Sequence, residues 1–131
     1  MVTIKKEIVE KLFKQAEEGL PNEVCGYLAG KDNQILEHYE LTNLDKSPEH
    51  FSMDPKEQFN AVKDAREKGY KIISCYHSHP ETPARPSAED IKLAYDPNMI
   101  YIIISLAGGS KEIKGYEIKE NNVKEIKLEV V

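Results

Sequence analysis

Apolar residues recur at helical spacing in two segments of the chain. In the first segment they predict a helix that ends at Gly19-Leu20-Pro21, and the apolar members are Ile4, Ile8, Val9, Leu12, Phe13 and Ala16. In the second segment Asp54 is placed to cap a helix that begins at Pro55 and ends before Gly69. We expect the buried face of this second helix to contain Phe59, Val62 and Ala65.

Shorter apolar runs bounded by turn residues predict strands. Residues 24–29 and 34–41 flank the turn residues Gly30, Asp32 and Asn33 and are expected to form a hairpin. Residues 100–106 are continuously apolar, which is typical of a central strand. The other expected strands are residues 71–78, residues 112–119 and a last segment with Val123, Ile126, Leu128 and Val130. The pattern predicts one mixed α/β (α+β) domain over residues 1–131.

The composition is that of an ordinary globular domain. The chain has 131 residues, 40% of them hydrophobic, and a net charge of -5. Its lysines are spread among glutamates, which argues against a nucleic-acid partner. No apolar stretch approaches the roughly 18 residues that span a bilayer, and residues 1–7 lack the apolar core of a signal peptide. We therefore expect a cytoplasmic protein with no membrane partner.

The two cysteines, Cys25 and Cys75, both lie in apolar strand-like runs. In a reducing cytosol such residues are more often buried apolar side chains than a disulfide. They do not form the Cys-x-x-Cys spacing of a zinc site. We therefore expect two free thiols.

The segment from His77 to Asp90 concentrates metal-binding residue types at the end of an expected strand. Because side chains alternate along a strand, His77 and His79 lie on one face and both can reach one ion. Asp90 supplies a third ligand. Two imidazoles and one carboxylate leave one position of a tetrahedral zinc ion open for water, as in catalytic zinc sites. Iron, cobalt and nickel accept the same ligands, so the residues alone do not select zinc.

The residues after the histidines indicate how the third ligand is positioned. Ser87-Ala88-Glu89-Asp90 matches a capping box, and Pro86 disfavours helix before it. The helix is expected to run to about Tyr95, and the partial positive charge at its N-terminus favours an ionised Asp90. Taken singly, Ser87 and Asp90 are better explained as helix caps. Their combination with two histidines favours a metal site.

The spacing of His77, His79, Ser87 and Asp90 resembles the signature of the JAMM (MPN+) metalloprotease family, with no position missing. That family places a glutamate upstream, in a region similar to residues 21–30 here, so the resemblance implies that Glu23 is the acid/base residue. Without the resemblance, Glu23 is one of many surface carboxylates near a helix end. The resemblance also implies a Zn²⁺ cofactor, a Ser87 hydroxyl that binds the oxyanion, and an MPN/JAMM fold. That fold is a curved mixed β-sheet flanked by helices, with the zinc site at a strand-to-helix junction.

Residues 23–30, Thr42-Asn43 with Ser47-Pro48, and residues 75–79 are similar to the compact prokaryotic branch of this family. The resemblance implies a zinc-dependent peptidase or isopeptidase that hydrolyses an amide bond at the C-terminus of a ubiquitin-like or sulfur carrier protein, for example releasing cysteine from the carrier. Two alternatives stay open. One is a non-catalytic MPN scaffold, although such relatives usually lose a ligand. The other is a RadC-like DNA-repair-associated protein, which normally carries an additional helical N-terminal region.

The spacing around the site also bears on the substrate. Only nine residues separate Asp90 from the strand expected at Ile100, so the insertion that larger JAMM deubiquitinases carry is absent. We expect the substrate to be a small carrier with a Gly-Gly tail, which enters a narrow groove beside the metal. We further expect the tail to pair with the edge of the strand that leads into His77. The sequence leaves open whether the protein is a homodimer.

Overall fold

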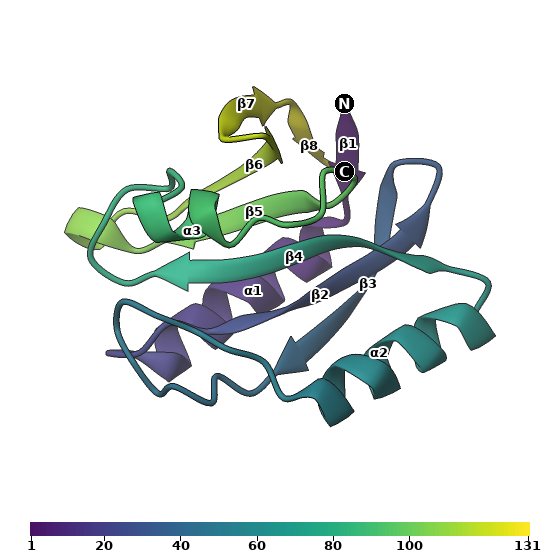
Figure 1. Cartoon of the computed structure of the whole chain (residues 1–131), viewed down its shortest axis with the longest axis horizontal. Coiled ribbons are helices and arrows are strands. Elements are labelled where there is room, and N and C mark those ends of the chain that lie inside the picture. Colours follow the sequence, from purple (N-terminus) through teal and green to yellow (C-terminus); the bar gives the residue numbers. More distant parts are fainter.

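The apolar runs of the chain form the strands of one curved sheet, with helices on both of its faces (Figure 1). The computed structural model describes all residues from 1 to 131. The helices are α1 (Lys6–Gly19), α2 (Pro55–Glu67) and α3 (Ala88–Lys92), with a 3-10 turn, η1, at Ala107–Gly109. The strands are β1 (Val2–Ile4), β2 (Cys25–Lys31), β3 (Gln34–Leu41), β4 (Lys71–His79), β5 (Ile100–Ser105), β6 (Glu112–Lys119), β7 (Asn122–Ile126) and β8 (Leu128–Val130).

The strands of the sheet follow the order β7-β6-β5-β4-β2-β3-β1-β8. β4 pairs in parallel with β5 and antiparallel with β2, so the expected mixed sheet is confirmed. The expected hairpin is confirmed as well, since β2 and β3 pair antiparallel. The two outermost strands, β7 and β8, are consecutive in the chain and separated by Lys127 alone. The sheet therefore bends round until its two ends approach each other.

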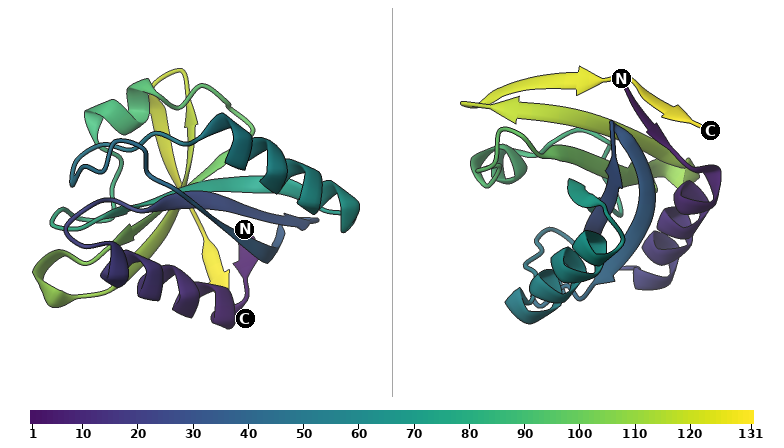
Figure 2. Two further views of the ribbon diagram at one scale, coloured as in Figure 1. Left: turned by 90° about the horizontal axis from the view of Figure 1, so that it is seen from below. Right: turned by 90° about the vertical axis from the view of Figure 1, so that its right-hand side faces the viewer.

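The pleat of β5 divides the core into two layers. Ile102 and Ile104 pack in the main cluster with the apolar face of α1, whereas Ile103 belongs to a cluster on the other face with Ala84 and Ile91. Figure 2 shows the same division, with α1 on one side of the curved sheet and α2 and α3 on the other. The side that carries α2 and α3 is the side on which the candidate metal ligands lie.

The first helix begins later than the apolar stripe predicts. Ile4 is fully buried but belongs to β1, which pairs in parallel with β3 and β8. Lys5 has extended backbone angles and separates this short strand from α1. A three-residue strand is too short to show a period of its own, so its last apolar residue was assigned to the helix by spacing alone.

The buried face of α2 differs from the expected one. Asp54 caps the helix and Pro55 begins it, as predicted. However, Phe59 is 68% exposed and Val62 is 36% exposed, while Ala61 and Ala65 are buried. Small side chains at this spacing let the helix approach the sheet closely, and Ala61 packs there on Cys25 and Leu41. The prediction of Phe59 and Val62 as core residues was therefore wrong, whereas that of Ala65 was right.

The third helix is shorter than predicted. It ends at Lys92, with Leu93 as its C-cap, and not near Tyr95. Ile91 and Ala94 nevertheless pack against the cluster around Ile103, so the helical spacing of the apolar residues continues past the last helical turn.

None of the helices has the length and apolar character that spanning a membrane requires.

Candidate metal centre

Three of the predicted site residues converge at the end of β4. His77 and His79 point to one face of the strand and are buried, each with 4% exposure. Their Nε2 atoms lie 3.1 Å apart, and each lies 3.0 Å from the same oxygen, Oδ2 of Asp90. One ligand atom from each residue is therefore within reach of a single ion.

The loop between β4 and α3 determines the orientation of His79. Nδ1 of His79 lies 2.8 Å from the carbonyl oxygen of Pro83, and because a carbonyl accepts only, Nδ1 carries the proton and donates it. The loop itself is attached to neighbouring strands, since Ser105 Oγ donates to the carbonyl of Thr82 at 2.6 Å and the Tyr116 hydroxyl donates to that of Ala84. In a neutral ring, Nε2 of His79 is then an acceptor that faces Asp90.

The capping box predicted at Ser87 is present. Ser87 Oγ accepts from the backbone N–H of Asp90 at 3.0 Å, and Asp90 Oδ2 accepts from the backbone N–H of Ser87 at 2.9 Å. Burial by itself raises the pKa of Asp90, but the two imidazoles, when protonated, and the backbone N–H of Ser87 outweigh it and hold the pKa well below its ordinary range. Asp90 is thus ionised at neutral pH, with its ligand oxygen turned toward the histidines.

The chemistry of these three atoms fits a bound metal ion. When neither Nε2 atom carries a proton, two nitrogen lone pairs and a carboxylate oxygen face one another within hydrogen-bond distance. Such an arrangement of acceptors is repulsive unless a cation or additional protons lie between them. Two imidazoles and a carboxylate are ligands that zinc and related transition metals accept.

Glu23 lies in the segment between α1 and β2 and is 5% exposed. Its Oε1 atom is buried without a hydrogen-bond partner. Burial raises the pKa of Glu23 to about 8, an effect that His79 opposes and Asp90, Glu89 and Glu49 reinforce. Glu23 is therefore not a solvated surface carboxylate but a buried acid close enough to His79 and Asp90 to respond to their charges.

The backbone that follows Glu23 is tied to the candidate metal strand. Ser78 lies between the two histidines, and its Oγ accepts from the N–H of Val24 at 2.8 Å while its own N–H donates to the carbonyl of Val24 at 3.0 Å. Since Ser78 points to the other face of β4, it can hold Val24 without entering the site. Glu23 is thereby fixed relative to the histidines.

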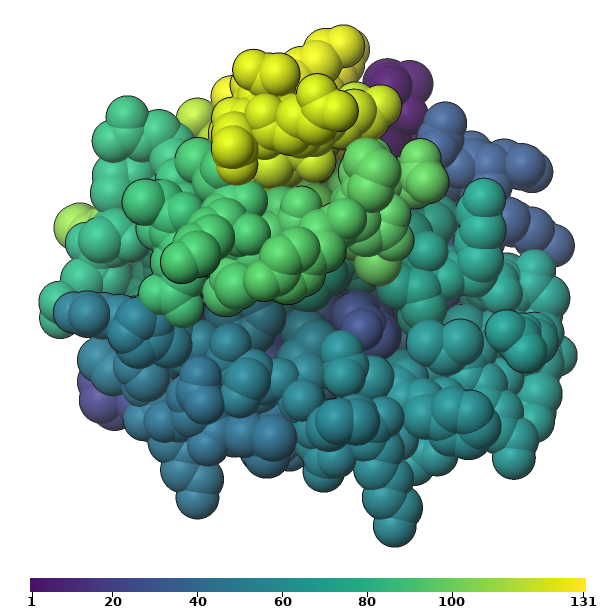
Figure 3. All heavy atoms as spheres, viewed as in Figure 1, coloured from purple at the N-terminus to yellow at the C-terminus, as the bar shows by residue number.

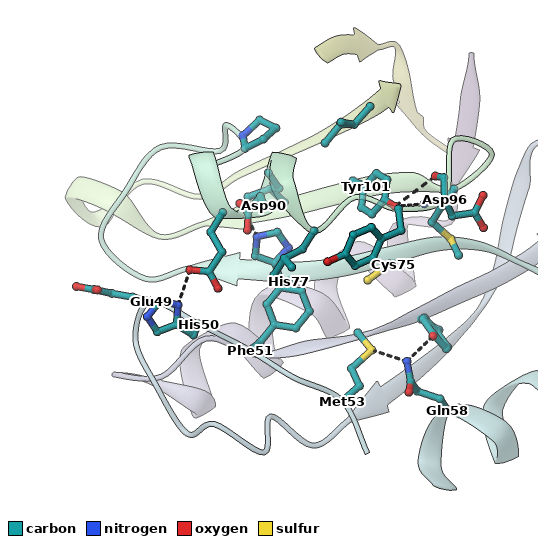
Figure 4. A pocket seen from close by; sticks show the side chains of 18 residues that line it. Glu49, His50, Phe51, Met53, Gln58, Cys75, His77, Asp90, Asp96 and Tyr101 are labelled. Carbon is teal, nitrogen blue, oxygen red and sulfur yellow. Dashed lines mark hydrogen bonds and ion pairs between the residues drawn. The ribbon is translucent and has the colours of Figure 1, made fainter. Parts of the chain in front are cut away.

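The residues of the loop between β3 and α2 that face the site were not identified from the sequence. The Phe51 ring stacks on the His77 ring, with centroids 4.7 Å apart and planes inclined by 23°. His50 Nδ1 lies 2.7 Å from Glu89 Oε2 on α3, and both residues line the cavity beside the site. Figure 4 shows His50 and Phe51 on the loop next to His77. Neither residue belongs to a spacing pattern, so no signal in the sequence marked them.

A cavity of about 340 Å³ opens beside the candidate ligands. Its walls come from the loop between β3 and α2 on one side and from α3 and the segment after it on the other, and Figure 3 shows the hollow between these two parts of the surface. Its lining is mainly apolar and includes Phe51, Met53, Cys75, Leu93, Met99 and Tyr101. A substrate segment can therefore reach His77 along this groove.

The groove gives the substrate a route to the site that differs from the one expected from the sequence, in which the substrate tail pairs with β4. β4 pairs with β2 over residues 71–77 and with β5 over residues 74–79. Residues 74–77, which lead into His77, are therefore paired on both sides and have no free edge, so the expectation that a substrate tail pairs with this part of the strand was wrong. Because β5 is continuously apolar, it is expected inside the sheet with a strand on each side, and β4 is one of these two neighbours.

Both cysteines are free thiols, as expected. Cys25 is buried in the sheet, and Cys75 lies in the wall of the cavity. Burial raises the pKa of each thiol to about 12. Neither is therefore a thiolate at neutral pH, and neither has the character of a nucleophile.

Sequence comparisons agree with the fold and the site. The family model described as prokaryotic homologs of the JAB domain matches residues 5–119. A CysO-cysteine peptidase of Mycobacterium tuberculosis is 33% identical over 134 residues, covering 100% of this chain and 92% of that protein. A desampylase of Pyrococcus furiosus is 33% identical over 109 residues, covering 82% of this chain and 76% of that protein.

Structural comparisons give the same fold. Protein DSY2949 of Desulfitobacterium hafniense superposes with a TM-score of 0.90 at 46% identity, covering 100% of this chain and 93% of the other. The JAB1/MPN domain protein AF2198 of Archaeoglobus fulgidus superposes with a TM-score of 0.69 at 23% identity, covering 99% and 97%, which shows the fold alone. The fold and the peptidase relatives define a JAMM-type hydrolase. The chain belongs to the prokaryotic branch of the JAMM/MPN family, as predicted.

Proposed function

We propose that this protein is a zinc-dependent peptidase or isopeptidase that hydrolyses the amide bond at the C-terminus of a ubiquitin-like or sulfur carrier protein. The observation that carries the proposal is the convergence of His77, His79 and Asp90, together with the buried, unpartnered carboxyl group of Glu23, the pKa of which responds to the charges of His79 and Asp90. A scaffold module needs neither three converging ligand atoms nor a buried carboxyl group. Both features lower the stability of the fold, so their presence favours a role in a reaction.

In this proposal His77, His79 and Asp90 hold Zn²⁺ through Nε2, Nε2 and Oδ2. When bound, the ion polarises the carbonyl of the scissile amide and makes water acidic enough to lose a proton near pH 7. The chain prepares these ligand atoms in advance, since Pro83 fixes the His79 ring and Ser87 fixes the Asp90 carboxylate. Such partners of ligands raise metal affinity because less order is lost on binding.

Glu23 is proposed to move the proton. Its carboxylate accepts a proton from the attacking water and passes it to the amine nitrogen as the C–N bond breaks. Burial raises the pKa of Glu23 to about 8 in the absence of metal, and a cation held by the neighbouring ligands would lower that pKa, which favours the carboxylate that the first step needs. The Oε1 atom has no partner within the protein that would compete with the water for its lone pairs.

Ser87 is proposed to stabilise the carbonyl oxygen as negative charge develops on it. The Oγ atom accepts from the Asp90 N–H, but a hydroxyl also has one hydrogen to donate. The residue is exposed at the start of α3, so this hydrogen is available to a substrate. Capping the helix and binding the oxyanion are thus compatible roles for one side chain.

The substrate class follows from the relatives and from the groove. The similar proteins are named for cleaving a cysteine adduct of CysO, for removing a modifier, and, in Thermus thermophilus, as a probable TtuB-protein conjugate cleaving protease. We propose that a carrier with a Gly-Gly tail threads between Phe51 and Leu93 into the groove. Two residues without side chains pass the His50–Glu89 pair at the mouth more easily than bulky ones.

The proposal is tested with carriers that end in Gly-Gly followed by cysteine or a short peptide, with cleavage followed by mass spectrometry. The zinc-loaded protein is expected to cleave after the second glycine, and Glu23→Gln and chelated protein are expected not to. Glu18→Gln, on the exposed face of α1, is the matched control and should retain full activity. If a carrier with two valines in place of Gly-Gly is cleaved as fast, the proposed tail specificity is wrong. If no carrier is cleaved by protein with one bound zinc, the proposed substrate class is wrong.

A further inference from the structure

The loop from Asn43 to Met53, called here the Asn43 loop, forms one wall of the site, and the side chain of Asn43 links the start of the loop to His50 and Ser52 near its end. The side-chain amide of Asn43 makes four hydrogen bonds. Its Nδ2 donates to the carbonyl oxygens of Glu23 and His50, both at 3.0 Å. Its Oδ1 accepts from the backbone N–H of Asp45 at 3.0 Å and of Ser52 at 3.3 Å. All the donors and acceptors of this amide group are used.

The chemistry of the four partners fixes the orientation of the amide. The two carbonyl oxygens accept only and the two backbone N–H groups donate only, so Nδ2 must face the former and Oδ1 the latter. No other side chain of similar size offers two donors and an acceptor in this planar arrangement. Aspartate has the shape but lacks the donors, and serine lacks the reach.

The Asn43 loop contacts the reactive groups at two points. Glu23 is held through both of its backbone polar groups, since its carbonyl accepts from Asn43 and its N–H donates to the carbonyl of Ser47 at 2.8 Å. The bond from Asn43 to the His50 carbonyl fixes the residue that precedes Phe51, the ring of which stacks on His77. One amide group thus connects the proposed acid/base residue with a proposed metal ligand.

We propose that Asn43 is a positioning residue of the hydrolytic reaction: its amide group holds the Glu23 backbone and the Phe51 segment in register, without contacting substrate or metal. This inference rests on the proposed function. On the other side, Ser78 ties Val24 to β4, so Glu23 is held between the metal strand and the Asn43 loop. Loss of the Asn43 side chain removes the bond to the Glu23 carbonyl and loosens the loop that carries Ser47, while leaving His77, His79 and Asp90 intact.

The role predicts a particular kinetic signature. A displacement of about 1 Å at a reacting group costs about 10²-fold in rate. Asn43→Ala is therefore expected to lower kcat about 10²-fold, with less than a threefold change in KM and with one zinc still bound per protein. Asn43→Asp keeps the acceptor for Asp45 and Ser52 but brings a negative charge to the two carbonyl oxygens, so it should be no better than Asn43→Ala.

Two control variants separate positioning from general loosening of the loop. Asp45→Ala removes the bond from Ser52 Oγ to Asp45 Oδ1, 2.9 Å long, and leaves all four bonds of Asn43 in place. Asn60→Ala deletes an amide group from the exposed face of α2. Both variants are expected to keep kcat within threefold of wild type. If Asp45→Ala lowers kcat as much as Asn43→Ala, the loop acts only through its overall stability and the inference is overturned.

Amide hydrogen exchange tests the inference without relying on activity. In Asn43→Ala the backbone N–H groups of Glu23 and Ser52 should exchange at least tenfold faster than in wild type, and in Asp45→Ala the Glu23 N–H should not. Unchanged exchange at Glu23, or faster exchange with an unchanged kcat, would overturn the positioning role. If wild type cleaves no carrier, the proposed function fails, and exchange at Glu23 alone then decides whether Asn43 holds that backbone.

Discussion

Glu23 combines two properties that a purely structural residue rarely has. It is buried, and its Oε1 atom has no hydrogen-bond partner. A buried polar group without a partner costs stability on the order of 1–3 kcal/mol. Residues that reduce stability in this way are found mainly where a reaction requires them.

Glu23→Gln is expected to abolish hydrolysis, with a loss of at least about 10³-fold, without lowering the free energy of unfolding. The amide has nearly the same shape as the carboxyl group but carries no proton that it can transfer, and its burial never requires neutralisation. Steady-state cleavage and urea unfolding of the same preparations measure both quantities. A loss of activity together with a loss of several kcal/mol in stability would instead indicate a structural role.

Replacing Ser87 is expected to lower both the stability of the protein and its turnover, and the two losses can be measured separately. Ser87→Ala removes the cap of α3, at a cost of about 0.5–2 kcal/mol, and it removes the donor to the oxyanion, at a cost of about 10²-fold to 10³-fold in turnover. Ser87→Thr retains both groups and should recover most of each. If Ser87→Ala is destabilised and yet turns over at the wild-type rate, the residue is a helix cap only.

At the scale of elements, the site is assembled from parts of different rigidity. β4 lies inside the sheet and is paired on both sides, so His77 and His79 have a fixed frame. α3 has only five residues and depends on its cap. The Asn43 loop has little regular structure, and four of the hydrogen bonds that order it and attach it to Glu23 come from one amide group.

The stack of Phe51 on His77 is expected to contribute to metal affinity. Aromatic pairs of this kind are worth about 0.5–1.5 kcal/mol, so Phe51→Ala should weaken zinc binding by about 2-fold to 10-fold because the imidazole loses its support. Competition with a chromophoric chelator measures this change. Phe59→Ala is the matched control, since Phe59 is 68% exposed on α2. Equal affinities for wild type and Phe51→Ala would show that the Phe51 ring only lines the groove.

The sequence predicted the local features of the site better than the tertiary ones. The strand period and the capping box were enough to bring His77, His79 and Asp90 to one junction, because both are short-range rules. The burial of Glu23 and the stack of Phe51 depend on a loop that folds back from far along the chain. Nothing within a few residues of either position reports that contact.

The errors in the fold have the same origin. Periodicity identified α2, but the choice between its apolar residues depended on how closely the helix approaches the sheet, which the pattern does not contain. The short strand β1 was merged with α1 because three residues show no period. The free edge expected for β4 was wrong because strand order is a property of the whole sheet.

At the scale of the whole molecule, one histidine outside the site links stability to pH. His38 on β3 has its Nε2 atom 2.9 Å from the Tyr76 hydroxyl, which in turn donates to Gln15 on α1. Burial, together with the nearby charge of Lys11, lowers the pKa of His38 to about 4, and Glu37 opposes this only weakly. The folded protein therefore holds His38 neutral at pH values where the unfolded chain protonates it.

The sign of the effect follows from this difference. Since the folded pKa lies below the unfolded value, the contribution of His38 is fully present above about pH 6.5 and is lost as the pH falls toward about 4. We expect a loss of about 1–2 kcal/mol across this range, because the ring is only partly buried and solvent screens its charge. Urea unfolding of zinc-loaded wild type and His38→Gln at pH 7 and pH 5 measures this loss. The loss is the fall in unfolding free energy of wild type between the two pH values minus the fall in His38→Gln. An identical pH dependence for both proteins would contradict the assignment.

The central claim is that a metal ion held by His77, His79 and Asp90 performs the hydrolysis, and it is tested most directly by titrating Zn²⁺ into chelated protein. Bound zinc and the rate of carrier cleavage are followed in the same samples, for wild type and Asp90→Asn. We predict that the wild-type rate rises linearly with bound zinc and levels off at one ion per chain, and that Asp90→Asn shows weaker binding and no comparable rate. Cleavage that is independent of bound zinc, or equal in Asp90→Asn, would contradict the claim.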